Sequence, residues 1–421
     1  MRPESLIQQI QTLSGTQEDL LHLLGLLSKN ENFVLQNHLV LLEGLSPSQH
    51  SLAYLFILWS WSNDALNANG DAAFMTLASV FLRECTEMQV SLAPGKFCSV
   101  CRAYKHQALK MRVARRAILP LRDALEKLLP TKEHISPVHV DFLQICMTTK
   151  HYSAVGDLLE RDIYEVDPEK TSLTLTDFLL YCYYGARVCI GLKKFPRAME
   201  LLYLAIVAPS MVPNAIMVMS YKLFLLLSLI RSGTVQELPK YTASSIQRVL
   251  KGGECEAYIA LGEAFGTHEG SVLDSCIEKH SEVFETDNTV GLVKQVLASL
   301  VKRNILRLTR TYVTLSLADI AGSVGLPSAD SAEMYVLKMI EAGEIHAEIS
   351  EVDGMVRFME DPEAYDNVEM AEHLDKQMLR CTELDRKLHE VHEELLCDRD
   401  YLTKVVSKEA RLDANDLGVR A

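Results

Sequence analysis

Residues Asn288–Asp361 read NTVGLVKQVLASLVKRNILRLTRTYVTLSLADIAGSVGLPSADSAEMYVLKMIEAGEIHAEISEVDGMVRFMED. Apolar residues from Leu292 to Val301 recur every three or four positions, which predicts an amphipathic helix. The segment Tyr312–Ser316 is short, β-branched and alternating, so we expect a strand there. The type of every later element in this stretch can be predicted in the same way.

Helical spacing returns over Leu317–Val324, and Gly325 with Pro327 ends it. Asp330 followed three residues later by Glu333 resembles a capping box, which predicts the start of a third helix over 328–343. The expected apolar face of this helix consists of Met334, Leu337, Met339 and Ile340.

The end of the stretch predicts a hairpin. Ile345–Ser350 and Met355–Met359 both read as strands, and Asp353-Gly354 between them is a frequent turn dipeptide. The predicted order is helix, strand, helix, helix and hairpin. That order is typical of a winged-helix unit, and we assign residues 288–361 to it.

Charge argues against DNA recognition by this unit. A helix that reads DNA carries Lys or Arg on its outer face, whereas the third helix is mainly acidic. The formal net charge of the chain is -14, which repels phosphate backbones. One basic cluster precedes the third helix: Lys302, Arg303, Arg307 and Arg310. We expect this cluster to pair with acidic neighbours, and nucleic-acid binding through it is the alternative.

The 287 residues before the winged helix predict helices throughout. Residues 1–137 form an N-terminal helical region, in which Pro120 is expected to end or kink a helix. In residues 138–287 the helices are expected to pair, because small and large apolar residues recur at tetratricopeptide-type spacing. These residues are Ala186, Phe195, Ala198, Leu202 and Ala205. Tyr152, Val155 and Leu159 repeat the spacing of Phe195, Ala198 and Leu202, 43 positions earlier. We therefore expect a solenoid of helical repeats.

A change of composition after residue 361 marks a separate tail. Residues 361–421 hold 16 Asp and Glu against 9 Lys and Arg, a net charge of -7. Within residues 362–405 an apolar stripe with coiled-coil-like spacing predicts one amphipathic helix. The stripe is Leu374, Met378, Cys381, Leu384, Leu388, Val391 and Leu395. We expect this helix to join an intermolecular bundle, with packing inside the same chain as the alternative. Residues 406–421 are expected to be disordered.

The sequence predicts no catalytic, cofactor-binding or metal site. His389 and His392 are three apart, whereas the zinc-protease helix needs two His four apart. His346-Ala-Glu348 lacks the cysteine pair of a zinc deaminase. Cys98 and Cys101 form the only C-x-x-C pair, and no second pair follows.

Cysteine usage and hydropathy predict a reducing compartment and no membrane span. The ten cysteines form no regular framework, and no apolar signal core follows the N-terminus. The most apolar runs, Leu52–Trp61 and Leu223–Ile230, are shorter than a membrane helix of about 18 residues. We expect both to be buried helices.

A solenoid followed by an acidic winged helix resembles the PCI-domain family. The resemblance is carried by Leu315–Ile320, Ala332–Leu337, Met339–Ile345 and Asp353–Phe358. PCI domains occur in scaffold subunits of the proteasome lid, the COP-nine signalosome and a translation initiation factor. Further runs are similar to one type of signalosome subunit. They are Tyr181–Gly185, Gly191–Phe195, Leu238–Tyr241, Gly291–Gln295 and Lys302–Leu308.

The resemblance implies a non-catalytic scaffold subunit of the signalosome, which removes a ubiquitin-like modifier from cullins. It further implies location in cytoplasm and nucleus, and an indirect effect on cullin-RING ubiquitin ligases. Other signalosome subunits would bind the edges of the winged helix and the C-terminal helix. The residues that we expect at these interfaces are Tyr312, Val313, Leu315, Val356, Phe358, Leu384, Leu388, Val391 and Leu395. The alternatives are a proteasome-lid subunit and a nucleic-acid-binding winged-helix protein.

Overall fold

The computed structural model describes residues 3–13, 17–65, 72–128, 134–163, 166–210, 212–250, 252–350, 352–360 and 367–405. The chain divides into two compact units. Unit 1 comprises Met1–Tyr312 and Ser316–Val336, and unit 2 comprises Val313–Leu315 and Leu337–Ala421. The predicted disorder of residues 406–421 and the predicted domain boundary at residues 361 and 362 lie outside the described residues.

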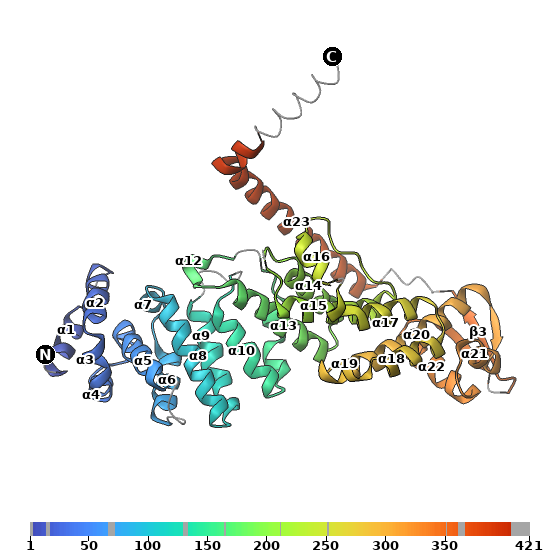
Figure 1. Ribbon diagram of the computed structural model, residues 1–421, viewed down its shortest axis with the longest axis horizontal. Coiled ribbons are helices and arrows are strands. Elements are labelled where there is room, and N and C mark those ends of the chain that lie inside the picture. The colour runs from blue at the N-terminus through green and yellow to red at the C-terminus, as the bar shows by residue number, and fades with distance from the viewer. Residues whose placement is uncertain are drawn as a thin grey trace, which may run out of the picture. The chain divides into compact units, whose positions relative to one another are not determined.

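The N-terminal part of unit 1 is built from helices (Figure 1). They are α1 (Pro3–Thr12), α2 (Gln17–Lys29), α3 (Glu31–Gln36), α4 (His38–Glu43), α5 (Ser51–Ala65), α6 (Ala72–Glu84), α7 (Glu87–Val90), α8 (Pro94–Lys110), η1 (Ala114–Ala117) and α9 (Ile118–Leu128). Leu52–Leu58 of α5 are each at most 2% exposed, because helices pack around α5 on several sides. The prediction of a buried helix there is confirmed.

Pro120 neither ends nor kinks a helix, contrary to the expectation. It is the third residue of α9 and is buried. In the first turn of a helix the missing N–H of proline costs no hydrogen bond, because those amides have no partner within the helix.

The central part of unit 1 consists of packed helices, as the repeat spacing predicts. They are α10 (Pro137–Thr148), η2 (Tyr152–Val155), α11 (Gly156–Glu160), α12 (Pro168–Thr171), α13 (Leu175–Gly191), α14 (Phe195–Val207) and α15 (Ala215–Arg231). Ala186, Ala198 and Ala205 are fully buried where α13 packs against α14. A Cβ atom on Gly185 would lie 2.9 Å from Leu159 Cδ2, so the absence of a side chain allows α13 to approach α11.

A further set of helices completes the solenoid. They are α16 (Ser244–Leu250), η3 (Gly253–Cys255), α17 (Glu256–Gly266), α18 (Gly270–Lys279), α19 (Ser281–Thr286) and α20 (Val290–Thr311). One polar cluster joins α15, α17 and the start of α20. Asp287 Oδ2 accepts hydrogen bonds from Lys222 Nζ and Tyr258 Oη, each at 2.8 Å, and Tyr258 Oη lies 2.9 Å from Thr289 Oγ1. The apolar side chains of Leu223–Leu229 in α15 are buried, as expected.

The elements after α20 follow the predicted winged-helix order. They are β1 (Thr314–Ser316), α21 (Leu317–Val324), α22 (Ala329–Glu341), β2 (His346–Ser350) and β3 (Met355–Met359). Strands β2 and β3 are antiparallel, with His346 opposite Met359 and Ser350 opposite Met355. The sheet order is β1-β3-β2, so β3 is the central strand.

The start of α22 differs from the prediction. Ser328 Oγ accepts a hydrogen bond from the Ser331 amide at 3.2 Å, so Ser328 caps the helix in place of Asp330. Gly325 ends α21 at φ +76°, and the Leu326 amide donates to the Ala321 carbonyl at 2.8 Å. Because α21 ends tightly, the chain turns at Pro327 and Ser328. The N-cap of α22 therefore lies at Ser328, two residues before the predicted position.

The apolar face of α22 was also only partly predicted. The buried positions are Ala332, Val336 and Met339, which are spaced four and three apart. Met334 and Leu337 are 52% and 46% exposed. Both faces of this helix carry apolar residues, so helical spacing alone does not select the buried one.

Helix α23 (Val368–Cys397) lies in unit 2, and after a break at Asp398 residues 399–405 are helical again, so the predicted single helix is interrupted there. Asn367 Oδ1 accepts a hydrogen bond from the Met370 amide at 2.9 Å and caps the start of α23. The predicted amphipathic C-terminal helix is confirmed up to Cys397. Within the described ranges, no helix is long and apolar enough to cross a membrane.

Candidate partner-binding surfaces

The edge of the small sheet is the first candidate surface. The Phe358 amide donates a hydrogen bond to the Val313 carbonyl at 2.8 Å, which attaches β1 to β3. Tyr312 is 46% exposed and Val313 is 70% exposed, while Leu315 is half-buried. No strand among the described residues pairs with the outer edge of β1. Backbone groups at such an edge can pair with a strand of another chain.

The expectation that the strand around Met355–Phe358 offers an edge needs correction. Strand β3 has a neighbour on each side, so its backbone groups are used inside the sheet. Val356 is fully buried and Phe358 is 7% exposed. The two edge strands are β1 and β2, because the hairpin places the later strand in the middle. Contact of Val356 or Phe358 with a partner would require the surrounding residues to move.

Helix α23 is the second surface, and none of its residues is buried. The predicted interface residues in it are exposed: Leu384 by 39%, Leu388 by 68%, Val391 by 51% and Leu395 by 43%. Apolar side chains that recur at this spacing on an exposed helix are typical of a helix that packs against other helices. The geometry suits the predicted role in a bundle, although the identity of the residues in contact stays a prediction.

Within the basic cluster on α20, Arg303 binds the end of a neighbouring helix. Arg303 donates from Nη2 to the Arg231 carbonyl at 2.5 Å, at the C-terminal end of α15. Burial lowers the pKa of Arg303. Its guanidinium therefore serves as a cap for α15 instead of pairing with a carboxylate, since the last carbonyls of a helix attract cations.

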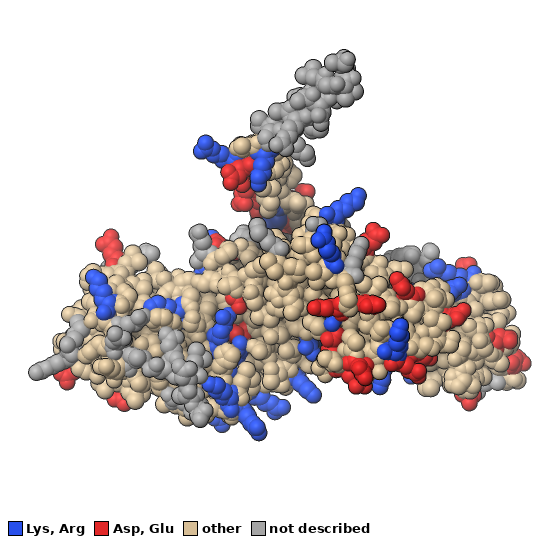
Figure 2. All heavy atoms as spheres, viewed as in Figure 1, with Lys and Arg blue, Asp and Glu red and all other residues tan. Residues whose placement is uncertain are grey.

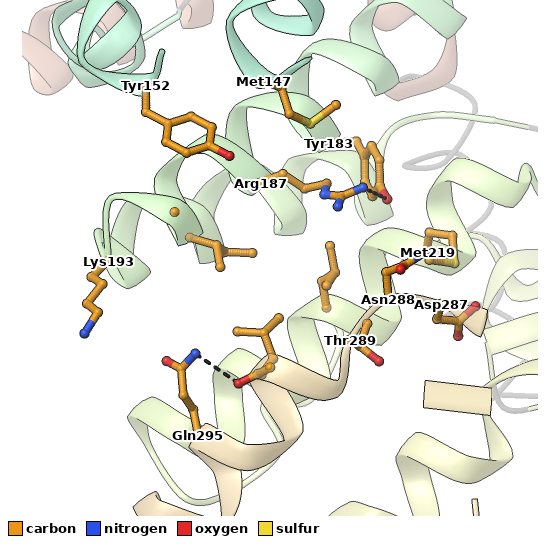
Figure 3. Close-up of a pocket in the computed structure, with 15 residues that line it drawn as sticks. Met147, Tyr152, Tyr183, Arg187, Lys193, Met219, Asp287, Asn288, Thr289 and Gln295 are labelled. Atoms are coloured by element: carbon orange, nitrogen blue, oxygen red, sulfur yellow. Dashed lines mark hydrogen bonds between the residues drawn. The ribbon is translucent and has the colours of Figure 1, made fainter. Parts of the chain in front are cut away.

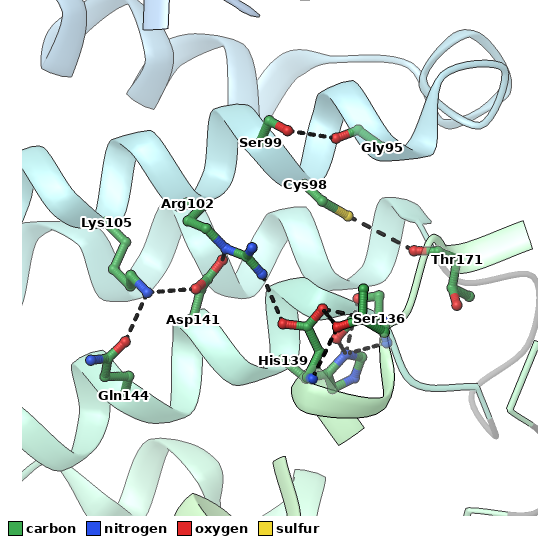
Figure 4. A network of polar contacts seen from close by, with 12 residues as sticks. Gly95, Cys98, Ser99, Arg102, Lys105, Ser136, His139, Asp141, Gln144 and Thr171 are labelled. Carbon is green, nitrogen blue, oxygen red and sulfur yellow. Dashed lines mark hydrogen bonds and ion pairs between the residues drawn. The ribbon is translucent and has the colours of Figure 1, made fainter. Parts of the chain in front are cut away.

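A buried polar network joins α8, α10 and α13 (Figure 4). Asp141 accepts a hydrogen bond from Lys105 Nζ at 2.7 Å, and Lys105 also donates to Gln144 at 2.8 Å. Arg102 donates to Asp177 at 2.9 Å. Burial raises the pKa of Asp141, and the neighbouring Lys105 ammonium opposes that shift. The network cross-links three helices, and the apolar spacing of these segments gave no sign of it.

The cysteine and histidine residues that resemble catalytic motifs belong to different elements. Cys98 and Cys101 are buried free thiols, and burial raises the pKa of Cys98 to about 12. His389 and His392 lie on the exposed α23, and His346 lies in β2. Among the described residues, no three His, Cys, Asp or Glu side chains are grouped to hold a metal ion.

Comparison with known proteins identifies relatives along nearly the whole chain. The family model of the N-terminal helical repeats of COP9 signalosome complex subunit 3 matches residues 17–246. The PCI domain model matches residues 277–360. COP9 signalosome complex subunit 3 of Arabidopsis thaliana is 39% identical over 417 residues, 98% of this chain and 96% of that protein. The subunit 3 of Dictyostelium discoideum is 34% identical over 369 residues, 87% of each chain.

Proposed function

The chain belongs to the family of COP9 signalosome complex subunit 3, and we propose that it holds this complex together through β1 and α23. It is a PCI scaffold subunit of the signalosome, the complex that removes a ubiquitin-like modifier from cullins. This subunit type is the one that the runs between Tyr181 and Leu308 resemble. The predicted family and fold class are therefore confirmed.

The exposed apolar stripe of α23 carries the proposal. A helix of 30 residues that buries none of them gains nothing from packing in this chain alone. Apolar side chains of this size contribute about 1.5–3 kcal/mol each when they are fully buried. Helices of other signalosome subunits would bury the stripe, while the outer edge of β1 would add a strand to a neighbouring winged helix.

We extend the proposal to reaction, partners and location. The chain itself catalyses no reaction, and another subunit supplies the isopeptidase. It affects cullin-RING ligases only through the assembled complex, and it works in cytoplasm and nucleus. The predicted domains 1-137 and 138-287 would form a peripheral solenoid. The predicted domains 288-361 and 362-405 would form the central region through which the subunit assembles.

The test is to tag the full chain, purify it from its own cells at native mass, and assay the eluate on a modifier-bearing cullin. We expect a large particle that removes the modifier, whereas the separately expressed full chain removes none. Elution of the chain alone, or with the proteasome, would contradict the proposed function. Modifier removal by the chain alone would contradict the non-catalytic role.

A further inference from the structure

Three helices of the solenoid, α8, α10 and α13, end in the same left-handed turn with a basic residue at its centre. Arg112, Lys150 and Lys193 follow α8, α10 and α13 and have φ values of +57°, +56° and +59°. In each turn the amide of the residue after the basic one donates a 2.9 Å hydrogen bond to the carbonyl five residues before it. The accepting carbonyls belong to Ala108, Cys146 and Cys189. This pattern is the Schellman motif, where glycine is the usual residue.

A basic residue at each of these positions is therefore unexpected. The left-handed conformation is unfavourable for a residue with a side chain, and glycine avoids this cost. Helix α15 of the same solenoid does end in glycine, with Gly233 at φ +71°. The attraction between a cation and the helix dipole at the C-terminus recovers only part of this cost. Ser172, His268 and Asn288 adopt the same left-handed conformation elsewhere in the chain, so the turn itself does not require a cation, and the charge of the three basic residues needs a separate explanation.

The three turns lie along one edge of unit 1. Helix α10 packs against both α8 and α13, and each of the three is followed by a chain reversal. Two more cations follow the first turn, in η1. We call the five exposed residues the basic ridge: Arg112, Arg115, Arg116, Lys150 and Lys193. Figure 2 shows basic side chains along the edge below α8, α10 and α13, and acidic ones over α17–α19.

The cations of the basic ridge are not neutralised within the described part of the chain. None of their side chains forms an ion pair or hydrogen bond with another described residue. Beside Lys193, the carboxylate of Glu160 is paired with Lys194. The ridge is thus a local positive region on a chain of net charge -14, and its free cations are available to an acidic ligand.

A cavity of about 400 Å³ begins where the ridge ends (Figure 3). Lys193 belongs to both the basic ridge and the cavity lining, and Met147 and Tyr152 form the adjoining wall of the cavity. Arg187 also lines the cavity and donates a hydrogen bond to Tyr183 Oη at 3.3 Å. The one carboxylate in the lining, Asp287, is already paired with Lys222. The cavity therefore combines apolar walls with a positive rim.

We propose that the basic ridge and this cavity bind an extended acidic polypeptide segment of a partner, with one apolar side chain inserted in the cavity. Packed helices lie about 8–10 Å apart, and an extended chain in the polyproline II conformation advances about 3.1 Å per residue with three residues per turn, which places every third side chain on one face. Acidic residues three positions apart would thus meet successive turns. A peptide fits better than nucleic acid, because the ridge is short and the whole chain repels phosphate backbones.

The test uses the full chain and a fluorescent twelve-residue peptide with Glu at every third position and one central Phe. Binding is followed by fluorescence anisotropy at low and high salt. We expect Lys150→Asn with Lys193→Asn to weaken binding by about two- to thirtyfold, since two exposed ion pairs are lost. Asparagine tolerates positive φ, so this double variant keeps the turns intact.

Two controls make the result specific. Lys240→Asn with Lys279→Asn removes the same charge from exposed sites outside the ridge and should leave the affinity unchanged. Replacing the peptide's Phe by Ala should weaken binding to the wild-type chain. Equal binding by the ridge variant and the wild type would overturn the proposal. A twelve-nucleotide single strand that binds more tightly, through the same lysines, would overturn it in favour of a nucleic-acid site.

Discussion

At the scale of single residues, His139 links stability to pH. It is 3% exposed, and the Ser136 amide donates a hydrogen bond to its Nδ1 at 3.1 Å. Burial lowers the pKa of His139 to about 4, because the neutral ring is favoured inside the protein. The unfolded chain takes up this proton near pH 6.5, so acidification favours unfolding.

We predict that His139 alone lowers the free energy of unfolding by about 2 kcal/mol between pH 7 and pH 5. The contribution is complete above pH 6.5 and is lost as the pH falls towards 4. Urea unfolding of the wild type and of His139→Asn at both pH values measures it. The difference between the two proteins isolates His139 from the carboxylates. An identical pH dependence of both proteins would refute the assignment.

Tyr258 is a second residue with a defined energetic role. Its hydroxyl forms hydrogen bonds with Asp287 and Thr289, directly before the start of α20. Tyr258→Phe should lower the free energy of unfolding by about 1–3 kcal/mol, because a hydrogen bond to a charged group is lost in a buried place. Tyr312→Phe is the matched control, since that side chain is 46% exposed. Equal urea midpoints for both variants would contradict this role.

At the scale of elements, the edge of β1 makes a prediction about assembly. Because the Val313 carbonyl points to β3, the backbone groups of Thr314 point to the open edge. Thr314→Pro removes the outward N–H without touching the Phe358 bond, and proline is tolerated on edge strands. We expect an unchanged melting temperature and reduced incorporation into the signalosome, measured by co-purification. Thr314→Val, which keeps the N–H, should incorporate normally.

The types of elements could be predicted from sequence more reliably than their details. Strong spacing and turn signals predict α21 between Leu317 and Val324, the bounds that the structure has. The cap of α22 was misplaced, because both Ser328 and Asp330 suit an N-cap and only the tight end of α21 decides between them. The order of strands depends on contacts between distant residues, so β3 was wrongly expected at an edge.

At the scale of the whole molecule, assembly and folding should be separable. Leu384→Ser with Leu388→Ser removes two exposed leucines from α23, and no described core residue depends on them. We expect the variant to keep its unfolding free energy while its share of the native particle falls severalfold. Glu383→Ser with Glu393→Ser places two serines on the opposite face and should incorporate normally. Equal incorporation of both variants would reject the stripe as an interface.

The sequence predicted the surfaces that follow from one element and missed those that several elements build together. The α23 stripe is visible in its spacing alone. The basic ridge draws on turns about 40 residues apart, and the cavity beside it draws on α10, α13, α15 and α20. Single lysines in loops carry no pattern, and only the stacking of helices brings them to one edge.

The exposure of α23 also bears on how long a copy survives in the cell. A newly made chain that has not met its partners displays a leucine-rich helix, the kind of surface that chaperones hold and quality-control proteases degrade. Partners that cover this helix would hide the leucine-rich surface from chaperones and proteases. The amount of the subunit would then follow the amount of its partners, and surplus copies would be cleared without any dedicated regulator.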